Sequence, residues 1–256
     1  MTTTVRSTAP KRVPMDSTRK ISLAAGVFYL ITFIASIPAQ FYSYAPVLKH
    51  SDYIVGPGND ARVLSGGLLE VIAALAGIGT AIALFPVVKR QNEAVALGFV
   101  AARIYEAGLM LIGVVSILAV VTLRQDGASG AEATSLITAG DSLVAVHDWT
   151  FLLGPGTVPA MNALCLGYLL YKSRLVPRII PTMGLIGAPL LLASAVATLF
   201  GVYSQASAIG ALLTVPIFFW ELSLGIWLVV KGFNPSPSPA GPTTPTAAPA
   251  DRVVTV

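Results

Sequence analysis

The stretch Arg103-Ile104-Tyr105-Glu106 lies inside the long apolar run AVALGFVAARIYEAGLMLIGVVSILAVVTL, residues 94–123. A run of this kind is typical of a helix that crosses a bilayer, which needs about 20 apolar residues. Arg103 and Glu106 are three positions apart, so they lie on one face of that helix, near its middle. A charge at this depth is costly in hydrocarbon, so we expect both side chains to face protein, water or a bound partner.

The composition of the whole chain agrees with a membrane location. Of its 256 residues 55% are hydrophobic and only 11% are charged, and the mean hydropathy is +0.77. A soluble domain carries roughly 25% charged residues, so this chain has too few to cover a water-facing surface. The net charge of +4 lies at one end and in two loops, which argues for membrane orientation and against nucleic-acid binding. The single cysteine, Cys165, excludes an intramolecular disulfide and is interpreted as a core residue.

Six apolar runs predict an all-α bundle of six transmembrane helices, because each is close to the length that spans a bilayer. The first run is too long for the apolar region of a signal peptide, about 7–15 residues, so we interpret it as a retained helix. Gly154-Pro155-Gly156 interrupts the fourth run and indicates either a plain kink or a hinge or binding notch. The runs cover residues 21–42, 62–88, 94–123, 143–171, 179–203 and 206–230.

The remaining segments are expected to be loops and tails. Residues 45–61 and 124–141 are polar enough to be loops. The six-helix domain of residues 21–233 lies between a basic disordered tail, 1–20, and a Pro/Thr/Ala-rich disordered tail, 234–256. Twelve Lys and Arg residues fall on the side of the two tails, and three fall on the other side. The positive-inside rule therefore predicts that both termini are cytoplasmic.

A weak internal repeat relates the two halves of the membrane part. Residues 104–109 (IYEAGL) resemble residues 219–224 (FWELSL) at an offset of 115 positions. Three helices per half is an odd number, so two such halves would be inverted, as in many secondary transporters. Apolar helices also resemble one another by composition alone, which is the alternative explanation.

A few polar side chains are predicted at membrane depth. With a rise of about 1.5 Å per residue, Arg103, Asn162 and Glu221 fall near the midplane, and Glu70 and Glu106 fall roughly one turn nearer the outside. In a purely structural interpretation, Arg103 pairs with Glu221 or Glu106, and the remaining glutamate stays protonated. In a functional interpretation, the surplus carboxyl relays protons or binds a cation.

His147-Asp148-Trp149 is predicted at the outer mouth of the fourth helix, where a belt of aromatic residues is expected. The plain interpretation of His147 is a hydrogen-bonded interfacial residue. A carboxylate-rich metal site formed with Asp148 and the buried glutamates is an alternative, but no ligand spacing supports it, and we predict no metal. The chain also lacks a phosphate loop, a dinucleotide glycine motif and a Gly-x-Ser-x-Gly elbow, so no cofactor is expected.

Several blocks match a known pattern in order: residues 85–93 (FPVVKRQNE), 103–106 (RIYE), 147–156 (HDWTFLLGPG), 167–178 (GYLLYKSRLVPR) and 219–221 (FWE). Together they resemble a bacterial membrane-protein family that is catalogued as a domain of unknown function, family 4386. The resemblance covers roughly residues 21–233. It implies a polytopic protein of the bacterial plasma membrane, and it carries no activity or catalytic residue to transfer.

Three functional hypotheses follow for a protein whose surroundings are the lipid bilayer. The leading one is a small carrier or binding protein for an amphipathic or cationic molecule, with a core of Arg103, Glu106, Glu221 and Glu70, in which Glu106 or Glu70 changes protonation. The second is an intramembrane enzyme acting on lipid or isoprenoid near the outer leaflet, with His147 and Asp148 as acid/base groups. The third is a non-catalytic membrane subunit that packs on a protein partner through small-residue faces. The sequence leaves the oligomeric state open.

Overall fold

The computed structural model of the protein describes residues 16–127 and 131–234. Within these ranges the chain is helical and has no strand, which confirms the predicted all-α class. Shorter helical pieces join the long helices: α2 (Ala45–Lys49), α6 (Val158–Asn162), α7 (Tyr168–Ser173), the π-helical turns η1 (Ala39–Ser43) and η3 (Ala163–Gly167), and the 3-10 turn η2 (Ser51–Ile54). The long helices are α1 (Ser17–Pro38), α3 (Asp60–Val88), α4 (Glu93–Asp126), α5 (Ala131–Leu153), α8 (Ile179–Leu199) and α9 (Ala208–Val230).

Five of the helices in the described ranges are long and apolar enough to cross a membrane: α1 with its continuation through η1, α3, α4, α8 and α9. These helices make the chain a multi-pass membrane protein. The predicted fourth helix, residues 143–171, is instead a composite of α5, a turn at residues 154–157, α6, η3 and α7. Its pieces are too short or too polar to count as a single apolar span.

Two segment predictions need correction. Most of the expected loop at residues 124–141 is helical, because α4 continues to Asp126 and α5 begins at Ala131. Gly127 ends α4, and its φ of +71° favours glycine. The expected loop at residues 45–61 contains α2 and η2, and Asn59 caps α3 by accepting a hydrogen bond from the Arg62 amide. The first helix begins at Ser17, inside the predicted tail of residues 1–20, and Asn234, predicted as the start of the other tail, donates hydrogen bonds to the carbonyl oxygens of Arg174 and Leu175. The remaining predicted tail residues, 1–15 and 235–256, lie outside the described ranges.

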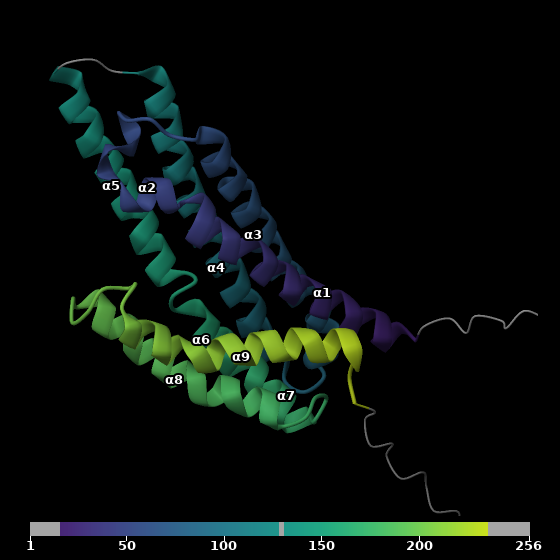
Figure 1. The fold of residues 1–256 in the computed structure, drawn as a ribbon. Coiled ribbons are helices and arrows are strands. Elements are labelled where there is room, and N and C mark those ends of the chain that lie inside the picture. Colours follow the sequence, from purple (N-terminus) through teal and green to yellow (C-terminus); the bar gives the residue numbers. More distant parts are fainter. Residues whose placement is uncertain (1–15, 128–130, 235–256) are drawn as a thin grey trace, which may run out of the picture.

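The helices form two groups that meet at one end (Figure 1). In the first group α1, α3, α4 and α5 pack side by side in that order. In the second, α8 and α9 form a hairpin, and α9 packs against α1. The two groups converge where α1 begins and α9 ends, and they diverge toward the turn between α8 and α9 (Figure 1). We call the converging end the basic end, since it carries Arg19, Lys20, Lys89, Arg90, Lys172, Arg174, Arg178 and Lys231.

A close glycine contact joins α1 to α9 near the basic end. A Cβ atom added at Gly26 would lie 2.8 Å from the carbonyl oxygen of Gly225, so the two backbones nearly touch. One turn away, the Arg19 guanidinium donates hydrogen bonds to the carbonyl oxygens of Leu228, at 2.8 Å, and Val229, at 2.5 Å. The last carbonyls of a helix lack partners within the helix, so Arg19 both caps α9 and fastens it to α1.

At the opposite end, Arg124 ties the loop before α3 to the end of α4. Its Nη1 atom lies 2.7 Å from Oδ1 of Asp60, and its other nitrogens donate to the carbonyl oxygens of Tyr53, Gly56 and Gly58. The Tyr53 hydroxyl donates to the same Asp60 oxygen at 2.8 Å. Burial and this hydrogen bond raise the pKa of Tyr53 above its ordinary value, which keeps the phenol neutral as a donor.

Candidate functional site

The centre of the site is Arg103, which α4 carries into the bundle between the two helix groups. Its Nη1 atom lies 3.0 Å from Oε2 of Glu106, one turn along α4. Its Nη2 atom lies 2.6 Å from Oε1 of Glu221 on α9. The Arg103 side chain is only 4% exposed, so both contacts are shielded from the surroundings. The sequence predicted a pair with one glutamate or the other, whereas the guanidinium binds both.

Asn162 extends this ion-pair group from a third direction. Its Nδ2 atom donates to the same Oε2 atom of Glu106 at 2.9 Å, and the residue is 1% exposed. Asn162 ends α6, and the π-helical turn η3 follows it at once. Such turns occur frequently at functional sites. Arg103, Asn162 and Glu221, predicted at similar depth, thus form one connected network with Glu106, predicted one turn nearer the outside.

Two aromatic rings hold the guanidinium from the apolar side. The Tyr29 ring centroid lies 5.2 Å from Cζ of Arg103, and the Phe99 centroid lies 6.0 Å away, which is within the range of a cation–π contact. Tyr29 and Phe99 are fully buried. Arg103 is therefore held by charge, hydrogen bonds and ring faces at once, as expected of a residue that fixes the geometry of its neighbours.

Glu70 stands apart from this network. It lies on α3 and is 6% exposed, and it makes no ion pair or hydrogen bond with any side chain that the structure describes. Its carboxyl lines the same cavity as Arg103, Glu106 and Glu221. The surplus carboxyl that the sequence predicted is therefore Glu70.

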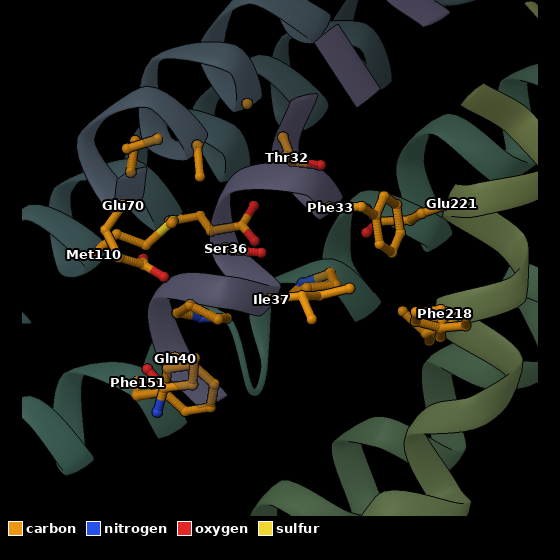
Figure 2. A pocket seen from close by; sticks show the side chains of 18 of the residues that line it. Thr32, Phe33, Ser36, Ile37, Gln40, Glu70, Met110, Phe151, Phe218 and Glu221 are labelled. Carbon is orange, nitrogen blue, oxygen red and sulfur yellow. The ribbon is translucent and has the colours of Figure 1, made fainter. Parts of the chain in front are cut away.

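The cavity has a volume of about 260 Å³ and lies between the two helix groups. Its lining is mainly apolar. Figure 2 shows Phe33 and Ile37 of α1 on one side and Phe218 of α9 on the other. Polar side chains are few and come from several helices. They are Thr32, Ser36, Gln40, Glu70, Arg103, Glu106, Thr214 and Glu221.

The charges around the cavity do not balance. If all four groups ionise, the three carboxylates of Glu70, Glu106 and Glu221 face the single guanidinium of Arg103. Gln40 adds an acceptor, because its Oε1 atom is buried and has no hydrogen-bond partner among the described residues. A buried, unbalanced negative site of this kind favours a cation.

His147 and Asp148, predicted as a polar pair, lie 3.2 Å apart at Nδ1 and Oδ1 but differ in exposure. His147 is 4% exposed and lies inside the bundle, whereas the Asp148 side chain is 61% exposed. His147 does not contact the Arg103 network, and it borders a second, smaller cavity together with Glu70 and Tyr44. In the part of the chain that the structure describes, no group of three or more His, Cys, Asp or Glu side chains could hold a metal ion.

Sequence reasoning missed Gln40, Tyr44 and Tyr29. Gln40 lies in η1, and Tyr44 follows that turn directly. A π-helical turn shifts the register of the residues after it, so periodicity counted from the first apolar run does not show which of them point inward. The one available signal is the polar group itself, a glutamine within an otherwise apolar helix.

A comparison with known families finds a match over most of the chain. The model of a family described as "Domain of unknown function (DUF4386)" matches residues 24–232. The chain belongs to this family. The match includes every residue of the Arg103 network and Glu70, so this DUF4386 protein carries its candidate site within the family domain. No curated protein and no solved structure matches the chain.

Proposed function

We propose that this DUF4386 protein binds a small amphipathic cation, an organic amine, in the cavity between its helix groups and carries it across the membrane. The observation that supports this most is Glu70, a buried carboxyl that has no cationic partner among the described residues and faces a largely apolar cavity. An ammonium group would give Glu70 that partner, and the apolar part of the same molecule would cover the aromatic lining.

The volume of the cavity limits the size of the amine. An engineered apolar cavity of about 150 Å³ holds benzene, and the cavity here is about 260 Å³. The space therefore suits one aromatic ring with a short aliphatic chain that ends in an amine. Larger multi-ring cations would have to push α1 and α9 further apart.

The lining residues would divide the work. Glu70 would accept the ammonium group, with Oε1 of Gln40 as a second acceptor. Phe33, Phe151 and Phe218 would contact the ring. Arg103 would not touch the cation: it holds Glu106 and Glu221 in place and offsets one of their two negative charges. Glu70 is the one carboxyl of the three that has no ion-pair partner among the described residues, so it is the group that would pair with a monovalent cation.

We place this carrier in the bacterial plasma membrane with both termini in the cytoplasm. In this arrangement the composite segment of α5, α6 and α7 also crosses the membrane, fourth in chain order, and brings the number of crossings to six. An even number of crossings puts both termini on one side. The two halves would then be inverted three-helix units. Glu106 and Glu221, which are equivalent at the offset of 115 residues, bind the same guanidinium, and this supports that relationship.

Three probes of equal shape test the proposal: phenylbutylamine, its neutral analogue phenylbutanol and its anionic analogue phenylbutyrate. Binding to the detergent-solubilised protein would be measured by calorimetry. We expect the amine to bind best, and Glu70→Gln to weaken it by roughly tenfold or more, about 1.4 kcal/mol. The matched control is Glu93→Gln, an exposed glutamate at the start of α4, and it should bind like wild type.

Two results would contradict the proposal. Equal binding of the amine and the alcohol would show that charge is not recognised. Unchanged amine binding in Glu70→Gln would show that this carboxyl is not the acceptor. If the amine binds as expected, counterflow of labelled phenylbutylamine in proteoliposomes separates a carrier from a protein that only binds.

A further inference from the structure

A second, smaller cavity lies beside the main one and shares Glu70 with it. Its volume is about 10 Å³, and its polar lining consists of Tyr44, Glu70, His147 and Thr150. That is about the volume needed to hold one water molecule, which also needs two to four polar partners. The cavity is thus a polar site of water size that connects the Glu70 carboxyl to a histidine.

Two glycines let the aromatic side chains of this cavity approach the neighbouring helices. A Cβ atom at Gly66 of α3 would lie 2.8 Å from Cε1 of Tyr44. A Cβ atom at Gly113 of α4 would lie 2.9 Å from Oγ1 of Thr150 and 3.4 Å from Cδ2 of His147. A Cβ atom at Gly66 would therefore displace the Tyr44 ring, and one at Gly113 would displace the Thr150 side chain beside the His147 ring. The packing therefore fixes Tyr44 and His147 against each other, edge to face, with ring centroids 5.7 Å apart.

Polar groups continue from this cavity to the surface. Nδ1 of His147 lies 3.2 Å from Oδ1 of Asp148, whose side chain is mostly exposed. On the inner side, Tyr44 is 1% exposed, and its hydroxyl has no hydrogen-bond partner in the described ranges. A buried hydroxyl without a partner is costly. Tyr44 lines the same small cavity as Glu70 and His147. A water molecule in that cavity would give its hydroxyl a hydrogen-bond partner.

We propose that Asp148, His147 and Tyr44 form a proton path between the surface and Glu70, so that the protein exchanges one proton for each ammonium ion it binds. This inference rests on the proposed function. When the ammonium ion arrives, the Glu70 carboxyl loses its proton and becomes the carboxylate that pairs with it. The proton passes through the Tyr44 hydroxyl and the small cavity to one nitrogen of His147, and the other nitrogen releases one to Asp148 and solvent. The net charge of the site does not change.

Of the three carboxyls around the main cavity, Glu70 is the one that is placed to exchange a proton through His147. The titratable or charged groups that line its cavities are Arg103 and Glu106 from α4, Glu221 from α9, His147 from α5 and Tyr44 after η1. From α1 and η1 only Thr32, Ser36 and Gln40 contribute polar groups. Glu106 and Glu221 are each paired with Arg103, and neither lines a route to the surface through His147.

The test measures proton release on amine binding. The purified full-length protein, in weakly buffered detergent solution with a pH-indicator dye, is mixed rapidly near neutral pH with phenylbutylamine at a concentration that saturates each variant. Wild type should release one proton for each amine bound. His147→Gln keeps the approximate length of the side chain, and Tyr44→Phe keeps the ring without the hydroxyl. Each should slow the release by roughly a hundredfold. The matched control His50→Gln changes the other histidine, outside the cavity, and should release like wild type.

Failure of the proton exchange and failure of the proposed binding function give different results. If the amine binds with the expected dependence on Glu70 but wild type releases no proton, the exchange is overturned and the binding function stands. If His147→Gln releases protons as fast as His50→Gln, the path does not run through His147. If the amine does not bind at all, the proposed function itself fails.

Discussion

Arg103 joins parts of the chain that are far apart in sequence. Through Glu221 it connects α4 to α9, and through Glu106 it reaches Asn162 of the broken segment. Removing the arginine would leave two buried carboxylates without a cation, which is more costly than never having had the charges.

At this scale we predict that Arg103→Gln lowers the free energy of unfolding by roughly 3–5 kcal/mol. The triple variant Arg103→Gln/Glu106→Gln/Glu221→Gln should regain most of that stability, because no charge stays buried. Cys165, half-buried and the only cysteine in the sequence, is a natural reporter when a thiol-reactive dye follows thermal unfolding.

The control for this experiment is Arg90→Gln, which changes an exposed arginine at the basic end. An Arg103→Gln protein that unfolds at the same temperature as this control would show that the network is not structural.

The network could be anticipated from the sequence, but its details could not. Depth counted along the helices placed Arg103, Asn162 and Glu221 at one level, and they are in contact through Glu106. Which carboxyl stays unpaired depends on how far apart α3 and α9 lie, and no pattern within one helix determines that. Glu70 and Glu106 were equally good candidates until the packing of the helices was known.

Among the elements, the broken segment between α5 and α7 satisfies the hydrogen bonds of several backbone groups locally, within its own turn. The amides of Gly154 and Gly156 donate to the carbonyl oxygens of Thr150 and Phe151, and the Thr157 hydroxyl donates to the carbonyl of Leu152. In an apolar environment such groups need partners. The turn also brings Pro155 and Pro159 to the wall of the main cavity, so the break forms part of the site.

The contact between α1 and α9 leads to a second prediction. Gly26→Ala would place a methyl group 2.8 Å from backbone atoms of α9, which cannot move as a side chain does. We expect a loss of roughly 1–3 kcal/mol in thermal unfolding. The matched control is Gly108→Ala, since nothing lies within 4 Å of a Cβ atom there. Equal stability of the two variants would mean that the helices separate at this point at no cost.

Apolar runs predicted five long helices well because length and composition determine which segments can span a bilayer. The same criterion failed for α5. Its first half contains Thr134, Ser135, Thr138 and Asp141, and this polarity resembles that of a loop. The helix forms there because α5 packs along α4, a contact that no local pattern contains.

For the whole molecule, the basic end and the opposite end differ in how their charges are used. At the opposite end, Arg62 binds a backbone carbonyl of η1, and Arg124 binds carbonyls of η2 and of the loop before α3. Several basic residues of the basic end, such as Lys20 and Arg90, are exposed. The basic end therefore carries more exposed positive charge than the opposite end, where Lys49 is exposed. An excess of positive charge on one side is the pattern that orients a membrane protein.

The predicted orientation can be tested with single cysteines in a Cys165→Ala background. Arg90→Cys lies at the basic end, and Gln205→Cys lies in the turn between α8 and α9 at the opposite end. A maleimide that does not cross membranes should label Gln205→Cys in intact cells, and Arg90→Cys only after the cells are broken. The reverse pattern would invert the topology and place the Asp148 end of the proton path inside the cell.

The weak hydropathy of α5 also matters while the ribosome is still making the chain. For a segment of this composition, the free energy of moving from the translocon into lipid is only weakly favourable. We therefore expect α5 to insert by packing against α4, which is inserted before it. We expect residues 131–173 to reach their final packing only when Asn162 donates to Glu106 and the α8–α9 hairpin brings Glu221 to Arg103, contacts that the folded structure shows. The polar network is therefore also an assembly signal, and damage to it would act first on the yield of inserted protein.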